Sequence, residues 1–210
     1  ASDVYKRQLL ICGMLSLNSA IATESGGSHY FPGAYNDFGM NLKLPPGLYF
    51  RDDLVYYGAK FSAGTTLGNF GVINLDEDLW TNLFKLAWVS DFKVLGANYS
   101  AVLVLPVIFD ANLSGSVQFG PHRISNHGNR GGMGDLAVAP LSLTWKWGDV
   151  NVDLSQYIFM PTGYYDANNI INLGRNYWSF DTLLGMTWID STRGHEISFR
   201  AGFMSNTEND

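Results

Sequence analysis

From Pro46 onward the chain alternates apolar and polar residues, with turn-forming residues at intervals. Successive side chains of a β-strand point to opposite faces, so a period of two predicts strands; almost no stretch shows the 3.6-residue period of a helix. The predicted strands cover residues 47–61, 79–92, 97–109, 133–147, 150–161, 177–190 and 195–204. The sequence therefore predicts an all-β fold of about seven strands, each longer than the about 5 to 6 residues usual in globular proteins.

The connections between these strands alternate in length. The predicted long loops are residues 62–78, 110–132 and 162–176, and the predicted short turns are residues 93–96, 148–149 and 191–194. In an up-and-down barrel every second connection lies at the same end, and outer-membrane barrels have short periplasmic turns and long external loops. This alternation predicts an antiparallel up-and-down transmembrane β-barrel.

Residues 150–160 show the expected polarity of the two faces. The even-numbered positions are mostly apolar, whereas the odd-numbered positions carry Asn151, Asp153, Ser155, Tyr157 and Phe159. In a membrane barrel the apolar face meets lipid and the polar face lines the lumen. The lumen or substrate-path candidates that we predict, aromatic or charged, are Tyr49, Arg51, Asp53, Tyr157, Phe159 and Arg175.

Tryptophans fall toward the predicted strand ends. Trp145 and Trp147 lie beside the tight turn at residues 148–149, and Trp178 and Trp188 lie near the ends of another strand. Amphipathic rings are enriched at lipid headgroup depth, so we expect these four side chains at the membrane interface. A soluble β-sandwich with a tryptophan-rich core is the alternative.

Composition agrees with a lipid-facing β protein. Only 15% of the 210 residues are charged, against about 25% in soluble domains. The net charge of −6 argues against a nucleic-acid partner, which would require clustered Lys and Arg, so the expected partners are membrane lipid and a hydrophobic small molecule. Cys12 is the single cysteine, which excludes an internal disulfide. The oligomeric state stays open.

The N-terminal sequence predicts a targeting region. Residues 1–8 resemble translated adapter sequence, residues 9–17 form an apolar core, and Ala20 and Ala22 provide the small residues of a signal-peptidase site. We expect residues 1–22 to be adapter plus partial signal peptide, with export to the bacterial outer membrane; a short buried helix is the alternative. Residues 23–45 are predicted to be an arm or plug, and residues 46–210 a partial barrel.

Candidate chemistry is sparse. His122 and His127 lie in a predicted loop without a standard ligand spacing, and His29 has no partner visible in the sequence. His195 and Ser198 are three residues apart on a predicted strand, so they face opposite sides. We therefore expect no enzymatic activity, no catalytic residue, no metal and no cofactor. Arg175 either pairs with an acidic residue, Asp166 or Asp181, or is solvated.

Four stretches resemble the family of the MetA-pathway of phenol degradation, whose members are SphA-like exported barrels. They are "HYFPG" at 29–33, "LPPGLYFRDDLVYYGAKF" at 44–61, "GMGDLAVAPLSLTWKWG" at 132–148 and "FMPTGYYDANNIINLGRNYWSFDTLLGMTW" at 159–188. The spaced pattern "PTG.YD......LG.NYW" in the last stretch is the most specific.

The resemblance implies an outer-membrane channel or transporter, porin-like, for uptake of hydrophobic or aromatic compounds. Family members continue through further strands, and bacterial single-chain barrels have even strand numbers, so we expect this chain to be a fragment. A structural or surface-interaction barrel without transport is the alternative function. A soluble periplasmic β protein is a third possibility.

Overall fold

A computed structural model of the chain describes residues 29, 40–64, 72–119 and 122–209. Over these residues the regular secondary structure is entirely β. The strands are β1 (Gly47–Gly64), β2 (Val72–Val94), β3 (Ala97–Phe119), β4 (His122–Met133), β5 (Leu136–Trp147), β6 (Val150–Met160), β7 (Ser179–Asp190) and β8 (His195–Asn206). No helix in this described part is long and apolar enough to cross a bilayer. The predicted targeting region, residues 1–22, lies outside the described residues.

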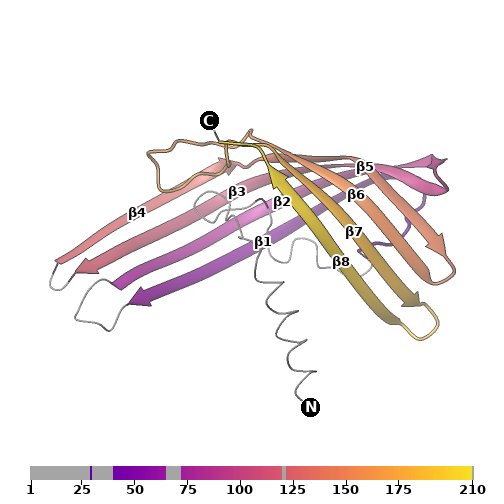
Figure 1. Ribbon diagram of the computed structural model, residues 1–210, viewed down its shortest axis with the longest axis horizontal. Coiled ribbons are helices and arrows are strands. Elements are labelled where there is room, and N and C mark those ends of the chain that lie inside the picture. Colours follow the sequence, from indigo (N-terminus) through magenta and orange to yellow (C-terminus); the bar gives the residue numbers. More distant parts are fainter. Residues whose placement is uncertain (1–28, 30–39, 65–71, 120–121, 210) are drawn as a thin grey trace, which may run out of the picture.

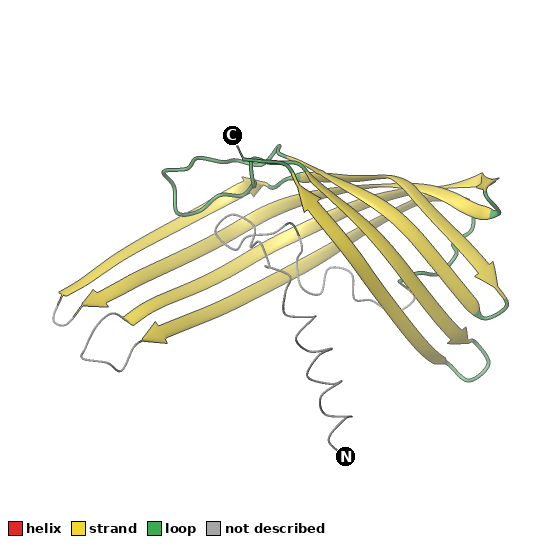
Figure 2. Ribbon diagram, viewed as in Figure 1, coloured by secondary structure: helices red, strands yellow, loops and turns green. Residues whose placement is uncertain are grey.

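The strands form one antiparallel sheet in the order β1-β2-β3-β5-β6-β7-β8, with β4 pairing β3. The sheet curves into a half-barrel, as Figure 1 and Figure 2 show. β5 pairs with the first part of β3 and β4 with the remainder, so β4 and β5 together occupy the place of one long strand. The predicted fold class, an incomplete antiparallel β-barrel about seven strands wide, is confirmed.

Pro106 lies where β3 changes partner. Val104 pairs with Ala137 of β5, and Val107 pairs with Met133 of β4. Proline has no N–H to donate, so it suits an interruption of the hydrogen-bond ladder. Its carbonyl accepts a hydrogen bond from the backbone N–H of Gly134, one of the two residues between β4 and β5, at 3.0 Å. Pro106 thus lies beside the joint between these two strands.

The prediction of long loops is wrong for two of the three segments. Most of residues 62–78 and 110–132 belongs to strands, because β1 continues to Gly64, β2 begins at Val72, and β3 and β4 extend to either side of residues 120–121. His122 and His127 accordingly lie on a strand, where both side chains are exposed. Figure 1 shows the two prolonged hairpins, β1–β2 and β3–β4, projecting together from one end of the sheet.

Polar cross-strand pairs stabilise the prolonged β1–β2 hairpin. The Lys60 ammonium lies 2.8 Å from Oδ2 of Asp76, and the Ser62 hydroxyl donates to Oδ1 of Asn74 at 2.7 Å. Such pairs hold a strand register as apolar pairs do, each contributing roughly 0.2–1 kcal/mol. The sequence resembled a loop here because of the glycines of residues 62–71 and the acidic run at residues 76–78, although Ile73, Leu75 and Leu79 keep a hydrophobic period of two on the opposite face.

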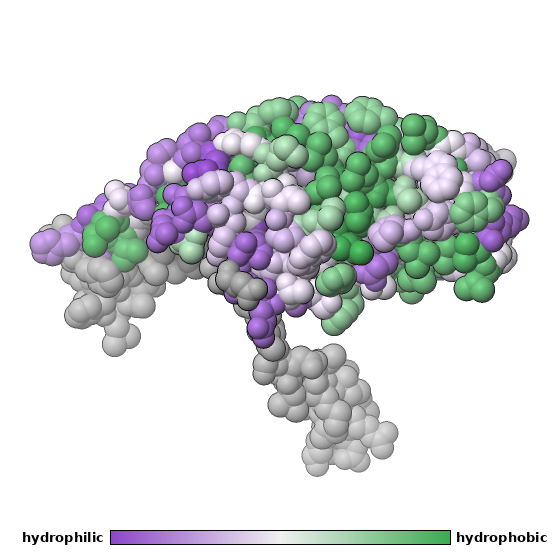
Figure 3. Space-filling view, turned by 90° about the horizontal axis from the view of Figure 1, so that it is seen from above, coloured by the Kyte–Doolittle hydropathy of each residue, from purple (hydrophilic) through white to green (hydrophobic). Residues whose placement is uncertain are grey.

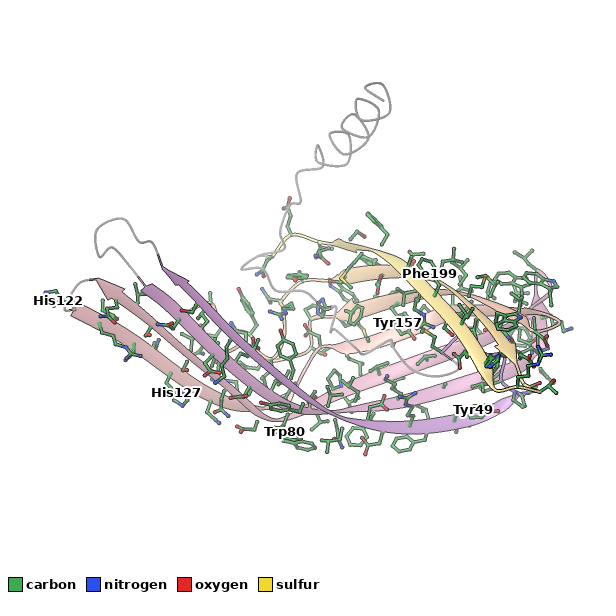
Figure 4. All side chains as sticks on the ribbon, turned by 90° about the horizontal axis from the view of Figure 1, so that it is seen from below. Tyr49, Trp80, His122, His127, Tyr157 and Phe199 are labelled. Atoms are coloured by element: carbon green, nitrogen blue, oxygen red, sulfur yellow. The ribbon has the colours of Figure 1, made fainter. Side chains whose placement is uncertain are left out.

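The convex face of the sheet is exposed and mostly apolar, although the Asn82 amide of β2 donates a hydrogen bond to Asp52 of β1 on it. Leu48, Phe50 and Leu54 of β1 are 64–70% exposed, and Phe199 and Phe203 of β8 are 61% and 75% exposed. Figure 3 shows hydrophobic residues gathered across the middle of the face that it displays, with hydrophilic residues over the projecting hairpins. Figure 4 places Trp80 on the convex side and Tyr157 on the concave side. The sheet thus presents its apolar face outward.

Candidate functional site

Buried polar side chains cover the concave face of β5, β6 and β7. They occupy alternate positions and therefore share one face of the sheet. They are Ser142, Asn151, Asp153, Ser155, Ser179, Asp181 and Thr187. In a soluble antiparallel sheet the buried face is the apolar one. The half-barrel has the opposite polarity, and its candidate site is this concave polar face.

Asp153 lies at the centre of the polar face. Its Oδ2 accepts hydrogen bonds from the hydroxyls of Ser142 at 3.1 Å and Thr144 at 3.2 Å, and its Oδ1 accepts one from Ser155 at 2.7 Å. Nη2 of Arg200, on β8, lies 3.8 Å from Oδ1. A buried carboxylate is tolerated where hydrogen bonds and an opposite charge compensate it. These four neighbours supply that compensation.

Residues 40–44 lie against the concave face and are held there by Arg200. Its Nη2 donates to Oδ1 of Asn41 at 2.7 Å and to the carbonyl of Met40 at 3.0 Å, and its Nε donates to the same Asn41 oxygen at 3.1 Å. The Asn41 amide in turn donates to Oγ1 of Thr187 at 3.1 Å. Asn41 is 2% exposed, so this segment is packed into the site.

Further contacts fix residues 40–44 in place. The backbone N–H of Lys43 donates to Oδ1 of Asn151 at 3.3 Å, and the Tyr49 hydroxyl donates to the carbonyl of Pro45 at 2.8 Å. Gly185 of β7 leaves room for the Asn41 side chain, because a Cβ at Gly185 would lie 2.5 Å from the Asn41 Cγ. The sheet is therefore shaped to receive this segment.

A cavity of about 160 Å³ lies between residues 40–44 and the sheet. Tyr157 lines it together with an apolar and a polar group of side chains. The apolar group includes Ala87, Val89 and Val102, and the polar group includes Ser142, Thr144 and Asp153. The cavity is large enough for a small molecule, and its lining is amphipathic, as is usual for ligand sites.

A second cluster forms around Asp135, between β4 and β5. Its Oδ1 accepts the backbone N–H of Gly163 at 2.8 Å, and its Oδ2 accepts the backbone N–H of Arg175 at 2.7 Å and lies 2.8 Å from Nε2 of His29. Gly163 and Arg175 stand at the two ends of the connection between β6 and β7. One carboxylate thus ties together both ends of this connection and the N-terminal segment.

Two glycines allow the ends of the β6–β7 connection to meet. A Cβ at Gly163 would lie 2.8 Å from Cα of Gly174, and a Cβ at Gly174 would lie 2.7 Å from the Gly163 carbonyl oxygen and from Oδ1 of Asp135. Both positions therefore exclude a side chain. The spaced Gly and Asn pattern of residues 161–178 has a structural explanation, since Asn176 also adopts a left-handed conformation at φ 59°.

The environment of Asp135 lowers its pKa. Burial acts in the opposite direction and raises it, but the hydrogen bonds from His29 and from the backbone N–H groups of Gly163 and Arg175 outweigh burial. The net effect places the pKa of this carboxyl below 3.8. Asp135 is therefore an ionised anchor at neutral pH.

His29 has partners that the sequence did not reveal. Besides Asp135, its Nδ1 lies 2.7 Å from the Ser179 hydroxyl, and its ring stacks on Phe159 at a centroid distance of 4.8 Å and meets Tyr177 edge-on at 5.4 Å. Ser179 is completely buried, so its hydroxyl has no access to a substrate. These contacts attach the N-terminal segment to the sheet rather than form an exposed nucleophile.

The structure distributes the predicted lumen residues over three places. On β1, Arg51 lies 2.6 Å from Asp53, which also pairs with Lys85 at 2.8 Å. Tyr157 lines the cavity, whereas Phe159 and Arg175 belong to the Asp135 cluster, and Tyr49 contacts Pro45. The hydrogen bond of Arg175 comes from its backbone. Sequence reasoning missed Arg200, Asn41 and Asp135. Each has a partner more than 100 residues away in the chain: Asn41 for Arg200, Thr187 for Asn41 and His29 for Asp135.

Aromatic residues gather at two levels of the convex face. At the level of the short turns, Trp147 pairs with Val150, which also pairs with Trp188, and the Trp145 and Trp147 rings stack at 6.5 Å. At the base of the prolonged hairpins, the Tyr56 and Trp80 rings lie 4.7 Å apart. Trp178 lies directly before β7 and is 42% exposed.

A mostly apolar belt separates these levels on β2. Trp80 and Trp88 are eight residues apart, or about 26 Å along the strand at roughly 3.3 Å per residue. Outer-membrane barrels have strands tilted by about 35–45°, and at that tilt this length spans about 19–22 Å of their apolar band of about 25 Å. Beyond Trp80 the same face is polar, with Asp78, Asp76 and Asn74.

No group of three or more His, Cys, Asp or Glu side chains that could hold a metal ion occurs within the described residues.

Residues 61–210 match the protein-family model described as "Putative MetA-pathway of phenol degradation". The comparisons with curated proteins and with solved structures gave no match.

Proposed function

The chain belongs to the family of the MetA-pathway of phenol degradation, and from this premise we propose that it acts as a channel for small hydrophobic or aromatic molecules in the bacterial outer membrane. The half-barrel fold is consistent with an outer-membrane barrel. One observation carries the proposal: the exposed convex face is apolar while the concave face is polar. That distribution suits lipid outside and a hydrated path inside.

The proposed path runs along the concave face. It combines charged groups on one wall, Arg51 and Asp53 with Lys85, with the aromatic ring of Tyr157 and the hydroxyls around Asp153 on the other. Mixed aromatic and polar lining gives weak binding to amphipathic rings, which permits both entry and release. A water-filled porin lined only by charges would pass such molecules poorly.

Uptake into intact cells tests the proposal. Cells that express the protein should accumulate radiolabelled phenol faster, at low external concentration, than cells that lack it. A labelled disaccharide serves as a polar control and should enter at the same rate in both. Equal phenol uptake in the two strains would contradict a transport role.

A barrel with a structural or surface-binding role is the second candidate, and the packing of residues 40–44 favours it. Asn41 is almost fully buried against the concave face, so this segment occupies part of the proposed path. Conductance across a planar bilayer separates the two candidates. A channel gives discrete current steps, whereas a filled barrel gives none.

A further inference from the structure

We propose that the contact between Arg200 and residues 40–44 is a releasable latch, which closes the concave path near the short-turn end of the half-barrel. The segment crosses three strands, because it contacts Asn151 of β6, Thr187 of β7 and Arg200 of β8. Asn151 and Thr187 pair with each other, and Asn151 lies two residues after the β5–β6 turn. The inference rests on the proposed function and adds regulation of the same path to it.

Polar contacts provide most of the hold on the segment. Arg200 donates three hydrogen bonds, two to the Asn41 side chain and one to the Met40 carbonyl. By contrast, Leu42 is only half-buried and Leu44 is 43% exposed. Hydrogen bonds to the sheet are replaced by hydrogen bonds to water when a segment leaves, so their net loss is modest compared with the exposure of a buried apolar side chain. The segment can therefore leave the concave face without unfolding the sheet.

Asp153 gives Arg200 a second partner. Nη2 of Arg200 lies 3.8 Å from Oδ1 of Asp153, which is too far for a hydrogen bond but within the range of an ion pair. That oxygen accepts the Ser155 hydroxyl, and a carboxylate oxygen has two lone pairs, so it can accept a second donor. The Arg200 side chain is only 16% exposed, and a mostly buried charge without a partner would oppose release. Exchange of Asn41 for Asp153 keeps the guanidinium paired in both states.

Asn151 and the cavity both favour release. Asn151 is 1% exposed, and its Oδ1 accepts the backbone N–H of Lys43, but its Nδ2 has no hydrogen-bond partner among the described residues. An unsatisfied buried donor is destabilising, and water would satisfy it once the segment leaves. Behind the segment lies the cavity of about 160 Å³, whose lining includes the polar side chains of Asn98 and Ser100. Release of the segment therefore opens a polar space toward the short turns.

A reducible cross-link tests the latch within one molecule. A Cβ at Gly185 would lie 2.5 Å from Cγ of Asn41, so cysteines at these two positions are close enough for a disulfide. In a Cys12→Ser background, the Asn41→Cys, Gly185→Cys variant has its segment tied to β7 when oxidised, and it lacks the Asn41 side chain when reduced. We expect current steps across a planar bilayer to be absent in the oxidised form and to appear after reduction. The same current in both forms would overturn the latch.

Cleavage by trypsin after Lys43, in detergent micelles, measures release without reference to transport. Arg200→Gln should speed this cleavage at least about tenfold, because hydrogen bonds from a charged donor are lost. The matched control is Arg193→Gln in the β7–β8 turn, which removes an exposed ion pair and should leave the rate within about twofold.

Asp153→Asn separates partner exchange from a merely structural role. Without the charged alternative partner, Arg200 should stay on Asn41, and cleavage after Lys43 should be slower than in the wild type. Faster cleavage would overturn the exchange, and an unchanged rate in Arg200→Gln would overturn the latch itself. Absence of current in every form, with the cleavage rates as expected, would refute only the channel function.

Discussion

Gly185 occupies its position because of a residue 144 places earlier in the chain, Asn41. Adding one methyl group there forces the Asn41 side chain away and breaks its bonds to Thr187 and Arg200. We expect Gly185→Ala to destabilise the protein by about 1–3 kcal/mol, the usual effect of overpacking. Residues 40–44 should become susceptible to limited proteolysis while the sheet stays folded.

The double variant provides the control for Gly185→Ala. Asn41→Ala removes the side chain that the new methyl group meets, so Asn41→Ala and Gly185→Ala should be strongly non-additive in a urea titration. Additive losses would show that the methyl group disturbs β7 itself. Packing of Asn41 against Gly185 would then have no role in holding the segment.

The lowered pKa of Asp135 predicts a pH dependence. Because the folded-state pKa lies below the unfolded value of about 3.9, the carboxylate stabilises the fold fully above about pH 4, and this contribution is lost as the pH falls through the folded pKa. Asp135→Asn should lower the urea midpoint at pH 7, and this loss should shrink as the pH falls below about 4. An equal loss across this pH range would mean that the charge of Asp135 contributes nothing.

At the scale of the strand, the apolar belt predicts that two substitutions on the same face of β1 lower stability to different extents. Leu54 lies in the belt and is 64% exposed, whereas Ser62 lies on the prolonged hairpin. An arginine on the lipid face of a barrel costs about 2–4 kcal/mol at the membrane midplane and about 0–1 kcal/mol outside it. Leu54 lies between the belt's edge and its middle, so Leu54→Arg should lower stability in lipid vesicles by more than Ser62→Arg.

Urea unfolding in detergent-free lipid vesicles measures the stability of both variants. Equal effects would contradict the assignment of the convex face to lipid. A loss confined to Ser62→Arg would place the hairpin, rather than the belt, in the apolar phase.

The strands were predictable from the sequence wherever one of their two faces is apolar. The alternation in residues 150–160 correctly separates outward Val152 and Leu154 from inward Asp153 and Ser155. It was missed for residues 72–78 of β2, where the acidic run at residues 76–78 obscures the alternation of Ile73, Leu75 and Leu79. Hydrophobic alternation is a weaker signal where acidic residues interrupt the apolar face.

The candidate site was less predictable than the strands. Tyr157 and Asp153 follow from alternation, but their neighbours Arg200 and Asn41 come from the two ends of the described chain. Similarly, His29 meets Asp135 across 106 residues. Contacts of this kind depend on the curvature that brings β8 and the N-terminal segment over the same concave surface, and a single sequence has no periodic signal for that.

For the whole molecule, the position of the turns predicts a topology in the membrane. The turns β2–β3, β5–β6 and β7–β8 lie at one end of the half-barrel, and the hairpins β1–β2 and β3–β4 project from the other (Figure 1). Short turns of outer-membrane barrels face the periplasm. Ser125 on β4 should therefore be outside the cell, and Thr192 in the β7–β8 turn should be inside the periplasm.

Single cysteines at these two exposed positions test the orientation, in a background with Cys12→Ser. A membrane-impermeant maleimide should label Ser125→Cys on intact cells, and should label Thr192→Cys only after the outer membrane has been permeabilised. The reverse order would show an inverted barrel. Labelling of both on intact cells would contradict insertion across the outer membrane, because the two ends of a spanning sheet lie on opposite sides of the lipid and cannot both face the medium.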